Sequence, residues 1–318
     1  MVRRNDMDKD SLKFLSREYG KGKKSLSERV VFIVAFLILL AYVILVGYFF
    51  FYGISLALLG NAEVYEEVQF EGKLYIPQWD KISFDAFYQA IFHLTDSTAS
   101  LKDFSFLQLT WNSIWRTTLY STLSIFTSCC VCYILVFYRS KLTRFIYNMG
   151  LFVSIIPLFG SAASTYQLYS NFLGTGIDLK GTVALVAMTS IGLYGGYFFY
   201  MYSFFKSLSW EYAEAGFVDG ANHYKVFFKI MLPMALPSVS ALFIMNFIMG
   251  WNDYENTLLY MQKYPNLSFA SYLFSNTNSN NVPVFMAATF VSLIPMLILF
   301  LIFQNSIMEK VHLGGLKG

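Results

Sequence analysis

Charged residues are scarce in this chain: of its 318 residues, only 14% are charged and 56% are hydrophobic. This much apolar surface exceeds what one soluble core can bury, so the composition indicates a polytopic membrane protein. The formal net charge is only +3, and the basic residues do not share a stripe with aromatic residues. A role in nucleic-acid binding is therefore not indicated.

Cysteine is almost absent, and the three that occur, Cys129, Cys130 and Cys132, fall within one apolar stretch. Thiolates in hydrocarbon would need a cation and further ligands, and the sequence places none nearby. We therefore interpret the cysteines as small apolar residues of a helix. We expect neither a metal site nor a disulfide framework.

The chain also lacks a nucleotide-binding motif. The sequence GKGKKS at 20–25 resembles a phosphate-binding loop, but the first glycine of that motif would fall at position 17, which is Arg17. Three histidines, His93, His223 and His312, lie in predicted loops or tails without the spacing of metal ligands. We expect no cofactor on this chain and no catalytic activity of its own.

Long apolar runs are what the chain has instead, and they predict an all-α fold with six transmembrane helices. The first run is too long for a signal-peptide core, so we interpret it as a retained helix. Most Lys and Arg residues then fall on the side of the N-terminal arm, which places both termini in the cytoplasm. The six predicted spans are 30–59, 111–138, 142–169, 182–205, 237–260 and 283–304.

These spans divide the chain into five parts. A basic cytoplasmic arm occupies 1–29, the first helix 30–59, and an extracytoplasmic loop 60–110. That loop could be a small cap, a docking surface for a soluble partner, or an inert connection. A core of five helices follows at 111–305, and a cytoplasmic tail at 306–318 ends the chain.

A polar, helix-prone segment at 206–237 interrupts the core and predicts a helix, a turn and a second helix. Asp219 and Gly220 form a turn signal, because glycine tolerates positive φ. Asn222 can cap a second helix at 223–231, which Pro233 and Pro237 would end. The apolar side of the first helix is predicted from Trp210, Ala213, Ala215, Phe217 and Val218. Such a hairpin could lie on the membrane surface or transmit movement from a soluble partner.

Two further features concern the pathway through the membrane. Pro157 is expected to kink the third span, either because that helix lines a pathway or because membrane helices tolerate proline. The fifth span ends in the polar residues Asn252, Asp253 and Tyr254. We expect these residues to contact a translocation pathway or a partner protein near the outer face.

The spacing of residues in 214–237 resembles the EAA loop of ABC-importer permeases. The residues that carry this resemblance are Glu214, Ala215, Gly216, Asp219, Gly220, Ala221, Ile230, Leu232 and Pro233. Gly216 departs from the pattern, which usually has alanine there. Further stretches resemble the MalG-type permeases of carbohydrate importers, namely Asn112-Ser113, Leu173-Gly174, 251–254, Pro295 with Phe303-Gln304, and 314–318.

This resemblance implies the type I ABC importer permease fold, with the EAA hairpin seated in a groove of an ATPase subunit. Glu214 would supply an acidic contact and Gly220 the tight turn. The packed surface around them would come from Tyr212, Phe217 and Ala221, supported by Leu232 and Pro233. Cofactors would then be ATP and Mg on the ATPase, not on this chain.

The resemblance also implies partners and a location. The partners would be a second permease subunit, two ATPase subunits or domains, an extracytoplasmic solute-binding protein and membrane lipid. The location would be the plasma membrane of a bacterium or archaeon. The chain would form half of the translocation pathway for an oligosaccharide or other carbohydrate.

Two alternatives to this function remain open. One is an importer permease for a solute other than a sugar. The other is a secondary transporter, which would couple to ions through carboxylates inside the membrane. The interiors of the first four predicted spans contain no carboxylate, and Asp253 and Glu255 lie near the edge of the fifth.

Overall fold

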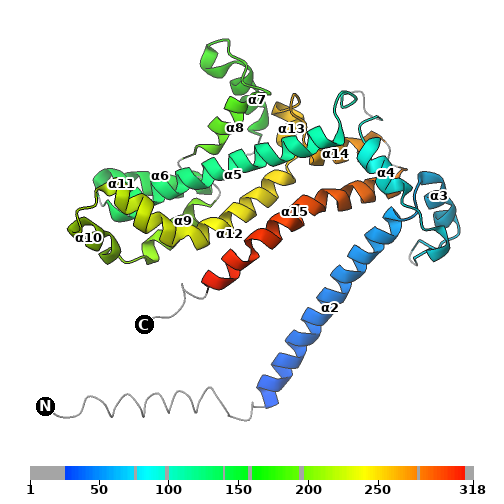
Figure 1. Ribbon diagram of the computed structural model, residues 1–318, viewed down its shortest axis with the longest axis horizontal. Coiled ribbons are helices and arrows are strands. Elements are labelled where there is room, and N and C mark those ends of the chain that lie inside the picture. The colour runs from blue at the N-terminus through cyan, green and yellow to red at the C-terminus, as the bar shows by residue number, and fades with distance from the viewer. Residues whose placement is uncertain are drawn as a thin grey trace. The chain divides into compact units, whose positions relative to one another are not determined.

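The computed structural model describes residues 26–74, 77–96, 100–138, 140–156, 160–192, 197–277 and 280–311, and these residues form helices with no strand (Figure 1). The chain divides into two units, 1–55 and 56–318. The glycine-lysine sequence at 20–25, Pro157 and the last seven residues lie outside the described residues.

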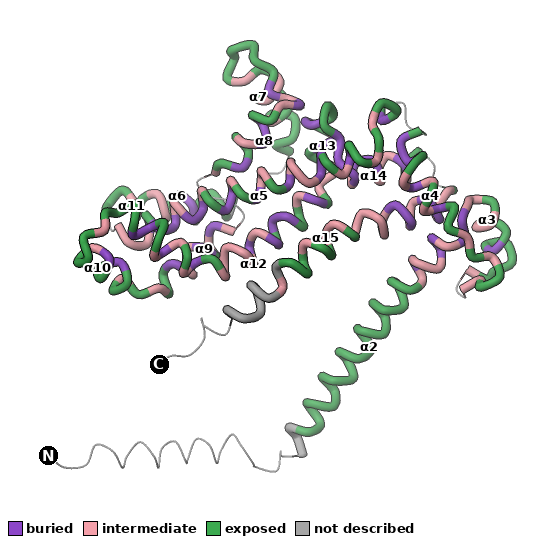
Figure 2. Tube along the Cα trace, viewed as in Figure 1, coloured by how far each residue is buried: buried purple, intermediate pink, exposed green. Residues whose placement is uncertain are grey.

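The first unit contains most of helix α2, Leu26–Ala57. Its side chains from Val30 to Phe50 are apolar almost without interruption and are exposed, as the green tube in Figure 2 shows. A helix that is apolar on every side needs an apolar surrounding. At 1.5 Å per residue it is about 48 Å long, more than the roughly 30 Å of hydrocarbon in a bilayer. The predicted span 30–59 is therefore a helix of membrane-spanning length.

The second unit is built around two long helices, α5 (Phe106–Phe137) and α12 (Leu232–Trp251). Ser105 and Gln108 cap the start of α5, each side chain bonding the other's backbone N–H, which begins the helix five residues before the predicted position 111. The two helices pack closely at Gly250, where an added Cβ would meet Thr117 Cγ2 at 3.1 Å. The α5 and α12 pair therefore forms the frame to which the other helices attach.

Two further helices complete this frame. Helix α9 (Phe198–Ser207) packs on α5, with Phe198, Met201 and Phe205 fully buried. The thiol of Cys132 donates to the carbonyl of Phe198 at 3.4 Å, so the cysteine serves as a small buried residue of α5, as expected from the sequence. Helix α15 (Val282–Val311) packs on α12 and buries Val284, Ala287 and Ala288.

In the part of the chain that the structure describes, four helices are long and apolar enough to cross a membrane, at 29–57, 106–137, 223–251 and 282–302. The other two predicted spans are each divided between shorter helices in the described residues. The segment 142–169 contains α6 (Lys141–Ile155) and α7 (Ala162–Ser170), and the segment 182–205 contains α8 (Val183–Ser190) and the start of α9. Hydropathy alone could not reveal these interruptions, because the residues around them are apolar.

The predicted extracytoplasmic loop 60–110 has a folded interior. It contains helices α3 (Ala62–Phe70) and α4 (Asp85–Phe92), with a single 3-10 turn at Trp79–Lys81 between them. Ala86 and Ala90 of α4 are fully buried in the cluster that includes Ala287 and Ala288 of α15. The α3 to α4 segment is thus a small cap on the end of the second unit and is more than a flexible connection.

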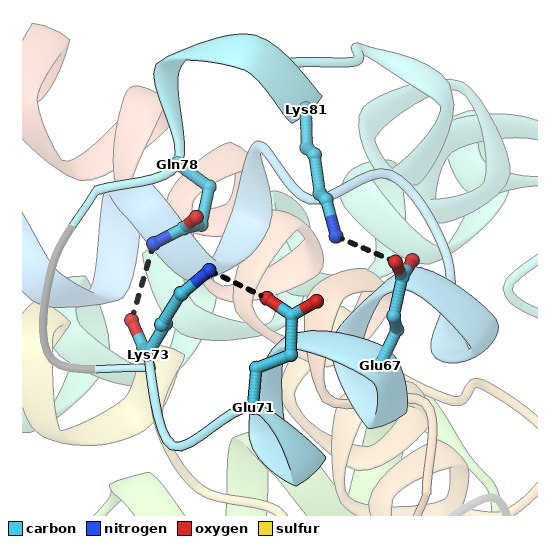
Figure 3. Close-up of polar contacts among 5 residues, drawn as sticks. All are labelled: Glu67, Glu71, Lys73, Gln78 and Lys81. Atoms are coloured by element: carbon cyan, nitrogen blue, oxygen red, sulfur yellow. Dashed lines mark hydrogen bonds and ion pairs between the residues drawn. The ribbon is translucent and has the colours of Figure 1, made fainter.

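Ion pairs fix the connection between these cap helices. Lys81 Nζ lies 2.9 Å from Glu67 Oε1, and Lys73 Nζ lies 3.0 Å from Glu71 Oε2 (Figure 3). Gln78 Nε2 donates to the carbonyl of Lys73 at 3.3 Å. The hydrogen bond from Lys73 and its charge lower the pKa of Glu71 below its ordinary value of 4.5.

Because the pKa of Glu71 is lower in the folded cap than in the unfolded chain, its ionised carboxylate stabilises the cap at pH values above the unfolded pKa. That contribution is lost as the pH falls through the lower, folded pKa. We expect Lys73→Met to raise the pKa of Glu71 and to reduce the loss of cap stability as the pH falls below about 5. Both groups are solvent-exposed, so the effect is small and screened by salt. Protease nicking at 60–110 against pH, in both proteins, measures it; identical profiles would contradict the prediction.

The segment 261–282, which the sequence indicates as a polar loop, contains helix α14 (Leu267–Thr277). Leu267, Phe269, Ala270 and Phe274 are buried in the same cluster as Trp251. The short helix α13 (Glu255–Tyr260) precedes it. Polar residues obscured the apolar face in the sequence, because that face is only one side of a short helix.

Candidate functional sites

The segment 206–237 forms the predicted hairpin. Helix α10 (Glu211–Val218) ends in a turn where Gly220 has φ +82°. Asn222 Oδ1 then accepts from Lys225 N at 2.9 Å and caps α11 (His223–Val226), as the sequence predicts. The positive φ at Gly220 is the conformation that only glycine adopts without strain.

The buried side of α10 differs from the predicted one. Ala213 and Gly216 are buried, Trp210 and Phe217 are half-buried, but Val218 is 88% exposed. The buried positions follow the spacing of three to four residues that a helix requires. Ala215 and Val218 were both predicted on the apolar side, and the helix turns both towards solvent.

Gly216 allows the two arms of the hairpin to pack closely. A Cβ added there would lie 2.6 Å from Ile230 Cδ1 and 3.2 Å from Val226 Cγ2. Glycine at this position, where the pattern usually has alanine, lets Ile230 and Val226 pack directly on α10. A side chain larger than that of alanine would push α10 away from the second arm.

The second arm continues without a break into the membrane-length helix. After α11 come five residues of π-helix at Phe227–Met231, and then α12 begins at Leu232. The prediction that Pro233 and Pro237 end this arm is therefore wrong. In the π-helical turn Leu232 N–H donates to Phe227 O, and this wider turn lets the chain take up a proline that lacks its own N–H.

Aromatic contacts join the base of the hairpin to the end of α5. Trp210 stacks on Phe137, with ring centroids 4.9 Å apart, and Phe227 lies 4.9 Å from Tyr133. Tyr138 OH lies 2.6 Å from His223 Nδ1. The first arm, the second arm and α5 thus form one packed unit around Ala213, Val226 and Met231.

The other predicted hairpin residues lie around its surface. Glu214, Ala215 and Asp219 are exposed, and Tyr212 is 52% exposed. Tyr224, at the start of the second arm, is 77% exposed. A further set is partly buried against the same core, namely Phe217, Ala221 and Leu232. The hairpin therefore presents acidic and aromatic side chains on a rigid base.

A cavity of about 560 Å³ lies at the other end of the α5 and α12 pair. Its walls come from both helices, from α7 and α8, and from the residues around α13. The predicted residues Asn252, Asp253 and Tyr254 all line it. The three residues thus share one cavity wall, and their contact with a translocation pathway or a partner protein stays a prediction.

Hydrogen bonds hold this rim in place. Asp253 accepts from Asn256 N at 3.0 Å and from Asn256 Nδ2 at 2.6 Å. Tyr254 stacks on Tyr272 of α14, with ring centroids 4.2 Å apart. Asn252 donates to the carbonyl of Ile248, one turn earlier in α12. Asn252 and Asp253 are thus oriented by their neighbours along the chain, and Tyr254 is oriented by its stacking on α14.

Arg116 is a residue of this cavity whose contacts the sequence did not predict. The sequence indicates an arginine that extends to the outer surface or pairs with an acid of the loop. Instead, Arg116 Nη1 donates to Thr257 Oγ1 at 2.9 Å and to the carbonyl of Tyr264 at 2.8 Å. Asn246, also in the cavity wall, had no signal in the sequence because it is one amide in an apolar run.

The described fold and sites define an all-α protein with several membrane-length helices and a rigid polar hairpin between two of them. Residues 101–312 match the family described as the inner membrane component of binding-protein-dependent transport systems. The chain belongs to this family of importer permease subunits, which are multi-pass transport proteins of the inner membrane and are not themselves enzymes. The resemblance inferred from the EAA-like spacing is confirmed.

Curated relatives include permeases named for sugar transport. The arabinooligosaccharides transport system permease protein AraQ of Halalkalibacterium halodurans is 28% identical over 236 residues, covering 70% of this chain and 81% of that protein. The melibiose/raffinose/stachyose import permease protein MelC of Bacillus subtilis is 27% identical over 184 residues, covering 57% and 65%.

A solved structure shares the fold. It is a crystal structure of a bacterial ABC transporter involved in the import of the acidic polysaccharide alginate. The match has a TM-score of 0.66 and 20% identity, and covers 90% of this chain and 99% of that chain. At this identity the likeness concerns the fold alone.

Proposed function

We propose that this chain forms half of the translocation pathway of an ATP-driven importer for an oligosaccharide or other carbohydrate. The observation that carries the proposal is the hairpin, which is packed on the end of α5 and continuous with α12. A force on α10 would pass through this rigid base into a membrane-length helix. The names of the relatives support a carbohydrate as the solute.

The proposed assembly contains a second permease subunit, two ATPase subunits or domains with ATP and Mg, and an extracytoplasmic solute-binding protein. The chain would have the type I permease fold with six spans and cytoplasmic termini. The pairs α6 with α7 and α8 with α9 would then each cross the membrane as an interrupted span. The hairpin would lie in the cytoplasm, where Lys206, Lys225 and Lys229 also fall.

The exposed hairpin residues would form the contact with the ATPase. Val218 is 88% exposed and Tyr224 77% exposed, although both are apolar enough to favour burial against a partner. Glu214 would supply an acidic contact, and Asp219 and Gly220 would shape the tip. Pro233, at the start of α12, would support the second arm.

Site-specific crosslinking tests this arrangement in the assembled transporter. A photoreactive residue at Val218 or Tyr224 is expected to crosslink to the ATPase subunit, because these side chains project from a rigid hairpin. The matched control is Glu255, an exposed residue at the cavity end, which should give no ATPase crosslink. A crosslink to the ATPase from Glu255 and none from the hairpin would contradict the proposed orientation.

A further inference from the structure

Two buried hydrogen-bond donors in the cavity have no acceptor. Asn246, on α12, is only 7% exposed, and its Nδ2 has no hydrogen-bond partner among the residues that the structure describes. The same holds for Nε of Arg116, on α5. Both residues line the cavity. Since buried polar groups in proteins are nearly always paired, the cavity calls for an occupant that offers acceptor atoms.

The guanidinium of Arg116 is already fixed in position. Its Nη1 atom bonds Thr257 Oγ1 and the carbonyl of Tyr264, and Asp253 lies near enough to stabilise its charge. Holding a recognition group in place before the ligand binds reduces the entropy lost on binding. Arg116 is therefore a pre-oriented donor, and the Asp253 carboxylate of the same cavity lies within electrostatic range of its charge.

The charges of the lining residues indicate an uncharged occupant. Arg116 is the one cationic residue among the described residues of the lining, and Asp253 and Glu255 are two carboxylates. An anionic ligand would meet this excess of negative charge and would be repelled. A ligand with hydroxyl groups can accept from the free donors and donate to carboxylates and carbonyls without a charge of its own.

The remaining surface suits the carbon faces of a sugar ring. Tyr120, Tyr169 and Tyr254 line the cavity and offer aromatic rings beside the polar groups. The volume of about 560 Å³ lies in the range of about 300 to 1,000 Å³ that ligand sites occupy. The cavity therefore combines fixed donors, carboxylate acceptors and aromatic surface at a suitable size.

We propose that this cavity is a binding site for a neutral sugar unit of the transported solute. The site is formed by α5, α8 and α12 and selects against acidic sugars such as uronates. This inference rests on the proposed function, that the chain forms half of the pathway of a carbohydrate importer. Water molecules that merely satisfy the two donors are the competing occupant, and the experiment distinguishes them from a sugar.

The test is a calorimetric titration of the complete transporter in lipid nanodiscs without its solute-binding protein. The probes are arabinotriose, raffinose and trigalacturonic acid. At least one neutral sugar is expected to bind at least about tenfold more tightly than the acidic one. Asn246→Leu should weaken that binding about tenfold, as expected for a lost hydrogen bond. The control is Ser121→Ala, which removes a buried, unpaired hydroxyl of α5 that does not line the cavity.

A second cavity variant tests the proposal independently in case Asn246→Leu fails to fold. Thr189→Val keeps the shape of the side chain on α8 but removes a hydroxyl from the cavity wall. It should weaken neutral-sugar binding while Ser121→Ala binds as the unmodified protein does. Absence of binding by either neutral probe, tighter binding of trigalacturonic acid, or unchanged affinity in both cavity variants would overturn the proposal.

Failure of this inference can be told from failure of the proposed function. If the unmodified transporter hydrolyses ATP faster with its loaded binding protein, the importer function stands, whatever the titration shows. If loaded binding protein has no effect on hydrolysis, the proposed function itself fails. Only the titration with the cavity variants decides the sugar site.

Discussion

In a transporter that carries Gly216→Val, the rate of ATP hydrolysis stimulated by the loaded binding protein is expected to fall at least about tenfold. That factor corresponds to roughly 1.4 kcal/mol of coupling. An added Cβ lies only 2.6 Å from Ile230 Cδ1 and 3.2 Å from Val226 Cγ2. Valine adds two further methyl groups to a space already filled, and overpacking of this kind costs about 1 to 3 kcal/mol. The hairpin would tilt on its base while the membrane helices stay folded.

Three variants separate this packing effect from other causes. Gly216→Ala should be mild, because the atom it meets is the mobile end of a flexible side chain. Combining Gly216→Val with Ile230→Ala should restore much of the stimulation, since the clash is removed. Normal stimulation in Gly216→Val, at normal expression, would show that hairpin packing does not control coupling; a lack of rescue would show that Ile230 is not the cause.

At the turn of the hairpin, backbone strain and not packing limits which residues are tolerated. Gly220 has φ +82° and no atom within 4 Å of an added Cβ, so space is not limiting there. Gly220→Val is expected to strain the backbone by about 1 to 2 kcal/mol and to reduce stimulation, whereas Gly220→Asn should be tolerated because asparagine adopts positive φ more readily. Stimulated ATP hydrolysis and membrane abundance of both variants measure this; equal activity would contradict it.

The hairpin was the part of the fold most accessible from the sequence. Its signals are local: a glycine that takes positive φ, an asparagine that caps the next helix, and an acidic cluster at fixed spacing. The role of Pro233 and Pro237 could not be predicted from the sequence, because proline usually ends a helix. Here a π-helical turn before Pro233 lets the helix continue, and residue type does not encode such a turn.

The cavity was only partly predictable from the sequence. Asn252, Asp253 and Tyr254 form a polar cluster that stands out against the apolar run before it. Arg116 and Asn246 lie in two helices and more than 100 positions apart in the sequence, and only tertiary packing brings them to one cavity. The same limit applies to α6 to α9, because hydropathy records which residues are apolar and not where a helix is interrupted.

The second large effect is expected at Asn112, which ties α5 to the segment before α14. Its Nδ2 donates to the carbonyl of Pro265 at 3.0 Å, and its Oδ1 accepts from Trp115 Nε1 at 3.1 Å. Asn112→Leu has a similar volume but leaves both partners unpaired in a site that is only 7% exposed. At about 1 to 3 kcal/mol for each buried group left unpaired, the purified transporter should unfold several degrees lower than the unmodified one.

Asn112→Asp keeps the acceptor for Trp115 but places a carboxylate oxygen against the carbonyl of Pro265. Because these two oxygens repel each other, this variant should be at least as harmful as Asn112→Leu. The matched control is Thr110→Val, two residues earlier in α5, whose hydroxyl donates to the carbonyl of Phe106 in its own helix. That variant should unfold at the unmodified temperature. Thermal unfolding of the detergent-purified complex, followed by tryptophan fluorescence, measures all three. If both Asn112 variants unfold at the same temperature as Thr110→Val, the link that Asn112 makes between α5 and the α14 segment does not stabilise this end of the fold.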